Sequence, residues 1–235
     1  LYPAFEDKYT LYAVNLFYHG KSKFPGHRKA LDSLKPAELQ SQIATVSKHF
    51  GFKNFAVAGY SLGGKLALLC AQLFPKKIIE LWLFAPDGIV KNFWYKVASN
   101  TKLGRTVYAG FLERPGLFFK TVNQVHRWGI INSKMREFVM GNMETRFQRE
   151  LVRDVWLAYR FLNPDMKTVI KNINQYQIPV YQFFGEKDSI IPPKLGVRFA
   201  QAIQQEDRLF VMKCGHWLFR DSVTEEIKRI QTEEG

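Results

Sequence analysis

The chain has 235 residues, of which 46% are hydrophobic and 23% are charged, which favours a globular protein with one substantial core over a disordered chain. Its apolar runs are short and interrupted, so they do not reach the ~20 residues that a membrane-spanning helix needs. The formal net charge of +13 would suit a nucleic acid or an anionic membrane as partner, but the basic residues are scattered and no nucleic-acid module accompanies them, so we interpret them as a solvated surface with a bias toward anionic partners.

The first expected element in chain order is a strand over residues 9–17, where residues that favour β structure alternate in character before a Tyr-His-Gly turn. A helix is predicted from 37 to 49, because Pro36 suits its first turn. The apolar run 55–58 predicts a second strand. The helix expected after it is closed by Pro75 and presents one apolar face, made of Leu62, Leu66, Leu69 and Leu73.

A nearly continuous apolar run over residues 79–84 fits a parallel strand that is covered on both faces. Residues 88–165 are dense in aromatic side chains with helical spacing, so we expect an inserted, mainly helical cap there. Beyond the cap, the patterns predict a strand, a helix, a strand and a closing helix, over 178–184, 193–205, 209–212 and 222–231. The alternation predicts an α/β fold with a mostly parallel sheet, built from residues 1–87 and 166–235.

The most informative motif is Gly59-Tyr60-Ser61-Leu62-Gly63, which lies directly between an apolar run and a helical pattern. This is the context of a nucleophile elbow, in which a strand turns sharply into a helix and strains its central residue. We expect Gly59 and Gly63 to leave room for that turn and Ser61 to be the nucleophile. The N–H of Leu62, at the positive end of the helix dipole, would then donate to an oxyanion.

A serine hydroxyl needs a base to take its proton and a carboxylate to orient that base. Asp188 follows the strand expected at 178–184, and His216 follows the next strand, so both lie at the carboxyl edge of the predicted sheet. With Ser61 first, Asp188 second and His216 last, the chain resembles the α/β-hydrolase superfamily outside the cap. The resemblance implies a Ser-His-Asp catalytic triad but does not specify the substrate.

Other residues compete for the roles of acid and base. Asp87 follows the 79–84 strand, where some family members carry the acid, although the loop and spacing around Asp188 fit better. Glu186 is interpreted as a surface or supporting group. His49 ends a helix, and His126 lies in the cap where it could line a pocket. Neither histidine follows the last strand, where the base belongs.

The His19-Gly20 pair resembles the oxyanion loop of the family, but residues 15–22 are closer to a later family segment that reads roughly Asp-x-x-Gly-His-Gly-x-Ser. This chain departs from that segment at Asn15 and Tyr18. If this alignment holds, the loop with the second oxyanion donor precedes Leu1. Either the sequence is then a fragment of a longer product, which we expect, or the family core is reduced in this protein. These 235 residues alone are then predicted to be poorly active and poorly soluble.

Cys70 and Cys214 are too few for a disulfide framework. We therefore expect a reducing, cytoplasmic setting, and no signal peptide is visible. Cys70 is interpreted as core packing, and Cys214 as a small buried neighbour of His216 rather than a second nucleophile. The histidines and cysteines lack metal-ligand spacing, so no metal and no cofactor is expected.

The leading hypothesis is a capped serine hydrolase that cleaves an ester, thioester or related acyl bond of a small molecule. The cap carries 13 Lys and Arg against 6 Asp and Glu, which would suit an apolar substrate with an anionic end. The cap's aromatics could equally be its own core and its charges a wet face. A lyase, a carbon–carbon bond hydrolase or an acyltransferase with the same triad remains an alternative, and so does a non-catalytic binding protein. The sequence leaves the oligomeric state open.

Overall fold

The computed structural model describes residues 1–90, 97 and 99–233. The chain divides into two compact units. The sheet unit comprises Leu1–Val14, Phe52–Ile89 and Pro164–Gly235, and the helical unit comprises Asn15–Gly51 and Val90–Asn163. Residues 15–51, which the sequence analysis assigned to the core, therefore group with the helical unit. Residues 91–96 and 98 of the expected cap lie outside the described residues, and the role of the cap as a lid stays a prediction.

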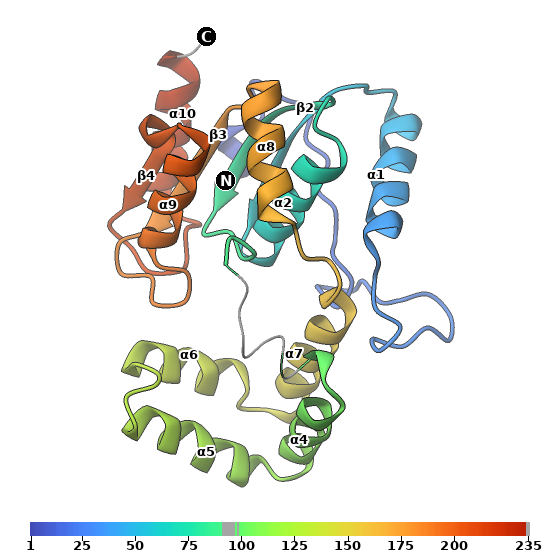
Figure 1. Cartoon of the computed structure of the whole chain (residues 1–235), viewed down its shortest axis with the longest axis vertical. Coiled ribbons are helices and arrows are strands. Elements are labelled where there is room, and N and C mark those ends of the chain that lie inside the picture. Colours follow the sequence, from blue (N-terminus) through green and yellow to red (C-terminus); the bar gives the residue numbers. More distant parts are fainter. Residues whose placement is uncertain (91–96, 98, 234–235) are drawn as a thin grey trace. The chain divides into compact units, whose positions relative to one another are not determined.

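The sheet unit is built on four parallel strands in the order β1 (Phe55–Tyr60), β2 (Ile78–Phe84), β3 (Val180–Gly185) and β4 (Leu209–Met212) (Figure 1). Every connection between neighbours is a crossover through a helix, as parallel pairing requires. The α/β fold with a parallel sheet is confirmed, and four of the five predicted strands lie within two residues of the observed ones.

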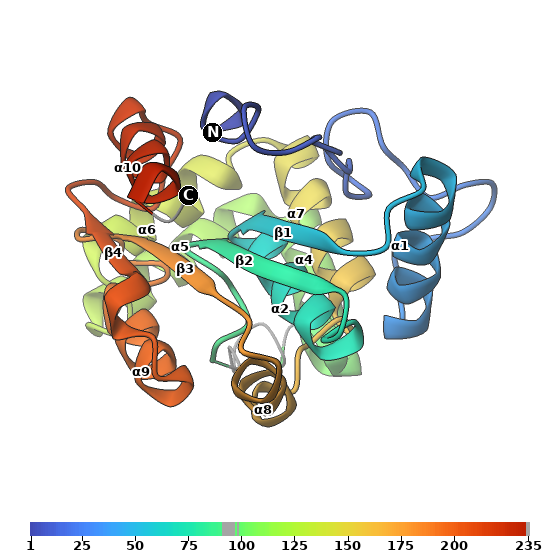
Figure 2. The ribbon, with the colours of Figure 1, turned by 90° about the horizontal axis from the view of Figure 1, so that it is seen from above.

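Helices cover both faces of this sheet. Figure 2 shows α8 (Met166–Tyr176) and α9 (Pro193–Ile203) on one side and α10 (Asp221–Glu233) on the other. Helix α2 (Leu62–Leu73) packs against β1 and α8, and the short 3₁₀ helix η1 (Tyr2–Ala4) packs against α10. The polypeptide thus encloses the sheet, which is why β3 is buried along its whole length.

The core on the α10 side is aromatic. Trp82 stacks on Tyr181 with ring centroids 4.0 Å apart. The same core contains one carboxylate, Glu80, which interrupts the apolar run of β2. Glu80 is held by two donors, Trp82 Nε1 at 2.9 Å and the hydroxyl of Tyr9. A buried carboxylate is tolerated in a core when it is hydrogen-bonded in this way.

The expected strand over residues 9–17 is wrong. These residues carry no strand assignment among the described residues, because a strand needs a hydrogen-bonded neighbour and β1 is paired with β2 alone. Helix α8 was not predicted at all. Its signal was present as Val169 and Ile173, four residues apart and both fully buried, after Asp165 at the N-cap.

The helical unit contains α1 (Pro36–Phe50), α4 (Lys102–Glu113), α5 (Pro115–Arg127), α6 (Ser133–Asn142) and α7 (Arg146–Tyr159). The predicted helix over 37–49 is confirmed as α1. Helix α4 packs on α5 and α7, and α5 packs on α6. Within the part of the chain that the structure describes, every helix falls short of the length and apolar character needed to cross a membrane.

Side-chain caps define where several of these helices begin. Thr101 accepts a hydrogen bond from the third residue of α4, Asn132 does so for α6, and Thr145 does so for α7. Such caps satisfy backbone N–H groups that have no partner inside the helix. The helices then enclose a small core of Phe118, Val122 and Met143.

Candidate active site

Ser61 occupies the sharp turn between β1 and α2. Its backbone angles are φ 50° and ψ −112°, a conformation that a side chain other than glycine adopts only at a cost of about 1–3 kcal/mol. Three backbone hydrogen bonds hold it there. Its N–H donates to Phe84 O at 2.9 Å, and its carbonyl oxygen accepts from Lys65 N at 3.2 Å and from Asp87 N at 2.9 Å. The predicted strained elbow is therefore present.

The glycines around this turn differ in what they contribute. A Cβ atom on Gly59 would lie 2.3 Å from the carbonyl oxygen of Gly63, so only glycine fits at position 59. The expectation that Gly63 leaves needed space is wrong, because a Cβ there would meet no atom within 4 Å. Gly64 has that role instead, since its Cβ would lie 2.5 Å from the Cβ of Pro86. The first turn of α2 passes this closely over the end of β2.

The structure brings together three side chains that are far apart in the sequence. His216 Nδ1 lies 2.7 Å from Asp188 Oδ2, and His216 Nε2 lies 3.3 Å from Ser61 Oγ. The side chain of Asp188 is fully buried, and that of His216 is 15% exposed. All three follow the carboxyl ends of parallel strands, namely β1, β3 and β4, where ligand sites of such sheets lie.

Asp188 is fixed from its other side as well. Its Oδ1 accepts hydrogen bonds from Ile190 N at 2.8 Å and from Ile191 N at 2.9 Å. With His216 at Oδ2, both oxygens of this buried carboxylate therefore have donors. The orientation of the carboxylate is set by the backbone and does not depend on the histidine.

The loops that carry Asp188 and His216 are locked together. A Cβ on Gly185 would lie 2.0 Å from the carbonyl oxygen of Gly215. The backbones of the two loops therefore contact each other directly, at a point where both have glycine. Lys187 N also donates to Cys214 O at 2.9 Å. Glycine at position 185 is thus a condition for the short distance between the carboxylate and the imidazole.

Tyr60, directly before Ser61, is part of the site and was not singled out by the sequence analysis. Its hydroxyl donates to the carbonyl oxygen of His216 at 3.1 Å, and the two rings lie 5.2 Å apart. Burial, aided by the charge of Asp188, raises the pKa of Tyr60 to about 12, so it remains a neutral donor. Phe219 packs on the other part of the ring at 4.8 Å. The only sequence signal was its place inside the elbow motif.

Asp87, the competing candidate for the acid, faces a different partner. Its Oδ2 lies 4.0 Å from the Nζ of Lys65, and its Oδ1 accepts from Gly88 N. The Lys65 side chain is only 2% exposed. Burial lowers the pKa of this lysine, and the charge of Asp87 opposes that effect in part. The structure therefore pairs Asp87 with a lysine on α2 and Asp188 with the imidazole.

The remaining candidates have other surroundings in the structure. Glu186 and His49 are exposed. His126 is in the helical unit, where its Nδ1 lies 2.9 Å from Ile131 O, and His19 Nδ1 contacts Phe17 O on the surface. Leu62 is the first residue of α2, so its N–H has no acceptor within the helix and lies at the positive end of the helix dipole. The assignment of Leu62 as an oxyanion donor stays a prediction.

Residues 1–222 match a family model described as the alpha/beta hydrolase fold. The chain belongs to this family. Among curated relatives, Lipase 1 of Psychrobacter immobilis is 25% identical over 174 residues, which are 69% of this chain and 50% of the lipase. The chain thus spans half the length of that relative. The uncharacterised hydrolase YugF of Bacillus subtilis is 22% identical over 217 residues, 91% of this chain and 76% of YugF.

Solved structures of other family members share the fold. A thermophilic esterase from Thermogutta terrifontis superposes with a TM-score of 0.57 at 18% identity, over 91% of this chain and 76% of the esterase. A meta-cleavage product hydrolase from Pseudomonas fluorescens superposes with a TM-score of 0.58 at 15% identity, over 99% and 81% of the two chains. At these identities the likeness is one of fold, and the reaction of an α/β-hydrolase depends on the residues of its own site.

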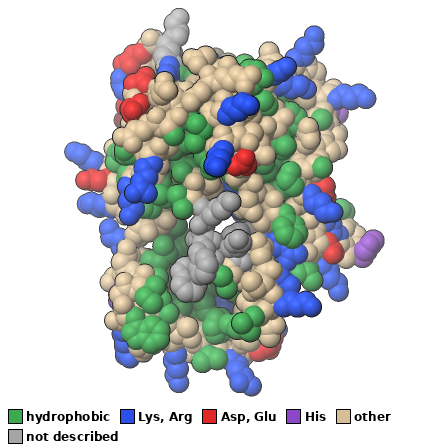
Figure 3. Space-filling view, viewed as in Figure 1, with side chains coloured by type: hydrophobic (Ala, Val, Ile, Leu, Met, Phe, Trp, Pro, Cys, Tyr) green, Lys and Arg blue, Asp and Glu red, His purple; other side chains and the backbone are tan. Residues whose placement is uncertain are grey.

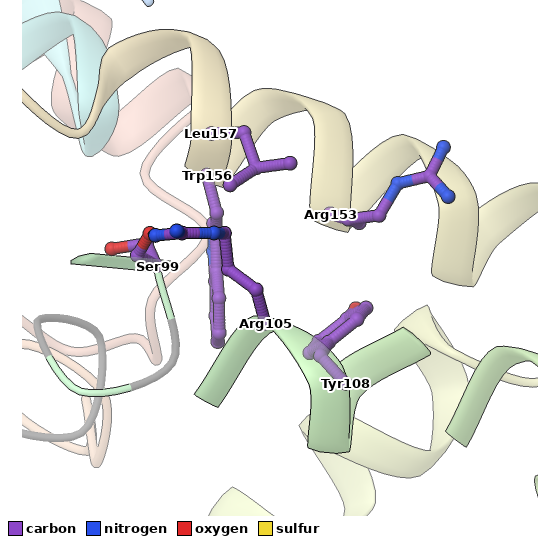
Figure 4. A pocket seen from close by; sticks show the side chains of 6 residues that line it. All are labelled: Ser99, Arg105, Tyr108, Arg153, Trp156 and Leu157. Carbon is purple, nitrogen blue, oxygen red and sulfur yellow. The ribbon is translucent and has the colours of Figure 1, made fainter. Parts of the chain in front are cut away.

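Two cavities of this α/β-hydrolase lie in its helical unit. The smaller one, of about 70 Å³, lies between side chains of α4 and α7 that face one another in Figure 4, together with Ser99. Its lining is formed by Ser99, Arg105, Tyr108, Arg153, Trp156 and Leu157. An open groove of about 720 Å³ is lined by Phe161 and by side chains between His27 and Glu38. The smaller cavity is well below the roughly 300–1,000 Å³ of typical ligand pockets, and neither contains Ser61, Asp188 or His216.

Among the described residues, no group of three or more His, Cys, Asp or Glu side chains could hold a metal ion. The arrangement around Ser61 consists of a hydroxyl, an imidazole and a buried carboxylate in hydrogen-bonded series, next to a helix N-terminus. These are the parts needed to generate an alkoxide nucleophile and to stabilise an oxyanion.

Proposed function

We propose that this α/β-hydrolase is a serine hydrolase that cleaves an ester, thioester or related acyl bond of a small molecule. The observation that carries the proposal is the hydrogen-bonded series from Asp188 through His216 to Ser61, with the serine held in the strained turn before α2. A surface serine with no catalytic role would need neither the strain nor a buried carboxylate behind the histidine.

In the first step, Ser61 Oγ attacks the carbonyl carbon of the substrate while His216 Nε2 takes the hydroxyl proton. His216 can accept that proton because its Nδ1–H is held by Asp188, which fixes the tautomer and stabilises the imidazolium that forms. The oxyanion of the tetrahedral intermediate would accept a hydrogen bond from Leu62 N–H. His216 then returns its proton to the leaving group, which leaves an acyl-serine.

In the second step, His216 removes a proton from water, and the resulting hydroxide attacks the acyl-serine. The intermediate collapses with Ser61 Oγ as the leaving group, and the proton on His216 returns to it. The acid product leaves and the free enzyme is restored. The series of three side chains suffices for both steps, so no metal or cofactor enters the proposal.

The two thiols support the expected compartment. Cys70 and Cys214 are both free and buried, and burial raises the pKa of each thiol. Buried thiols with raised pKa values are poor nucleophiles, so Cys214 is not a rival to Ser61. We infer a reducing compartment such as the cytoplasm, where free cysteines persist.

The test is labelling with a fluorophosphonate probe together with hydrolysis of p-nitrophenyl esters and acyl thioesters of short and long acyl chains. We expect both signals in the full-length wild-type protein and neither in its Ser61→Ala variant. Ser41→Ala is the matched control, because Ser41 is an exposed serine on α1 and its loss should change neither signal.

Three outcomes distinguish the alternatives. Labelling and turnover that both depend on Ser61 would support a hydrolase and rank the acyl chains. Labelling that depends on Ser61, without hydrolysis of any ester or thioester, would overturn the hydrolase and favour the lyase or acyltransferase alternative. No labelling of a protein that unfolds cooperatively on heating would overturn the assignment of the nucleophile.

A further inference from the structure

The turn between α5 and α6 exposes two large apolar side chains. We call residues 127–134 the hairpin tip. Trp128 is 67% exposed and Ile130 is 54% exposed. The turn between them is built by Gly129, at φ 71°, and is closed by a hydrogen bond from Ile130 N to Val125 O at 3.2 Å. The two side chains are thus presented by an ordered, hydrogen-bonded turn.

These side chains are not a displaced part of the core. Helix α5 already buries its apolar face, since Phe118 and Val122 pack with Met143. The exposed face of the same helix carries Leu117, which is 52% exposed, and Lys120. Exposed apolar side chains that gather on a surface and are rimmed by polar ones mark contact sites for proteins or membranes.

The charge around the tip is of one sign. Residues 127–136, which comprise the tip and the start of α6, contain no Asp or Glu and three basic residues, namely Arg127, Lys134 and Arg136. Elsewhere in the helical unit some basic residues have acidic partners, as Arg146 does in Glu113 and Glu150. Among the described residues the ion pairs of this unit all lie outside 114–136. Figure 3 shows hydrophobic and basic side chains side by side over this part of α5 and α6.

We propose that the hairpin tip docks this protein on an anionic lipid bilayer. Trp128 and Ile130 would enter the headgroup region, where tryptophan side chains are favoured. Arg127, Lys134 and Arg136 would lie against the lipid phosphates. Apolar insertion and electrostatic attraction add in such peripheral contacts, and neither is sufficient alone. The combination distinguishes a bilayer from a nucleic acid, which the bases could attract but for which the isoleucine has no use.

This inference does not depend on the proposed hydrolase activity. It concerns a surface of the helical unit, whereas the hydrogen-bonded series of Ser61, His216 and Asp188 lies in the sheet unit. It also accounts for part of the net charge of +13, which the chemistry of an acyl hydrolase does not need.

The test is sedimentation of the protein with vesicles of phosphatidylcholine alone or mixed with phosphatidylglycerol, at low and physiological salt. We expect binding to the mixed vesicles only, and weaker binding as salt screens the charges. The double variant Trp128→Ala/Ile130→Ser should bind about tenfold more weakly or worse. The double variant Arg127→Gln/Lys134→Gln should bind roughly 25-fold more weakly at low salt, since each charge near the surface contributes about fivefold in affinity.

Phe147→Ala is the matched control. Phe147 is an even more exposed aromatic residue of the same unit, at 73%, but it lies beside Arg146, which is paired with two glutamates. Its loss should leave vesicle binding unchanged. The proposal is overturned if the wild type does not bind the mixed vesicles, or if the tip variants bind as well as the wild type. It is also overturned if Trp128→Ala/Ile130→Ser instead abolishes self-association in size-exclusion chromatography, because the tip would then be an interface between copies.

Discussion

Asp188→Asn is the most informative single change in the proposed site, because the backbone dictates how the new amide must lie. Two N–H groups, those of Ile190 and Ile191, donate to Oδ1 of the carboxylate at 2.8 and 2.9 Å. An asparagine side chain has only one oxygen, and that oxygen must accept the hydrogen bonds from these two N–H groups. Its NH₂ group must then face His216 Nδ1, where the carboxylate oxygen Oδ2 lies at 2.7 Å in the wild type.

The alternative orientation of the amide is unfavourable. It would leave the two backbone donors facing an NH₂ group in a fully buried position, at a cost of about 1–3 kcal/mol for each unsatisfied group. The preferred orientation forces His216 to accept a hydrogen bond at Nδ1 and to carry its one ring proton at Nε2, the atom that faces Ser61 Oγ at 3.3 Å. In that tautomer the imidazole cannot take the serine proton. A change of this kind lowers kcat by about 10⁴, or roughly 5.5 kcal/mol of transition-state stabilisation.

The assay is the hydrolysis of the best p-nitrophenyl ester by wild type, Asp188→Asn and Asp87→Asn, each checked for cooperative thermal unfolding. Asp87→Asn is the matched control, because Asp87 faces Lys65 and not the imidazole. We expect kcat to fall by three to four orders of magnitude in Asp188→Asn only, with KM little changed. Retention of more than about a tenth of kcat in Asp188→Asn, or a larger loss in Asp87→Asn, would show that the tautomer argument is wrong.

Three further predictions concern buried polar groups near or under the site. Tyr60→Phe removes the hydroxyl that holds the His216 carbonyl at 3.1 Å, so kcat should fall about tenfold at unchanged KM, and an unaltered kcat would refute the positioning role. Gln182 is fully buried on β3, and neither polar atom of its amide has a partner among the described residues. Gln182→Met should therefore raise the free energy of unfolding by about 1–2 kcal/mol in urea titrations. A lower free energy of unfolding in the variant would contradict this. Burial lowers the pKa of Lys65 in the folded protein below its ordinary value of 10.5, which applies in the unfolded chain. Between the folded and the unfolded pKa, the unfolded chain binds more protons than the folded protein, so the free energy of unfolding rises with pH. Lys65→Met should flatten that rise in unfolding measured at pH values up to 10.5, and an equal slope in both proteins would exclude Lys65 as its source.

Local patterns in the sequence were sufficient for most secondary structure. Apolar residues spaced three and four apart predicted α2, and short apolar runs between helices predicted β1 to β4. The same patterns placed Ser61 at a strand-to-helix turn, and its φ of 50° bears out the expected strain. These features depend on contacts within a few residues, which is why composition and spacing predict them.

The features that the sequence did not predict depend on contacts with residues far along the chain, which no local pattern shows. Residues 9–17 have the composition of a strand, but a strand forms only against a hydrogen-bonded neighbour. Gly63 and Gly64 are equivalent in the sequence, and only the approach of Pro86 makes Gly64 the one that has no room for a side chain. Lys65 looks like a surface lysine of an amphipathic helix until the packing of the sheet unit buries it.

The sequence by itself determined the fold class, the position of the elbow and a short set of candidates for the acid and the base. Only the tertiary structure placed these candidates in space, with His216 between Ser61 and Asp188 and with Asp87 beside Lys65. The physical reason is that these contacts join residues far apart in the sequence. Ser61 and His216 are 155 positions apart, and a distance of that kind is set by how strands pair and how closely loops such as those at Gly185 and Gly215 can approach.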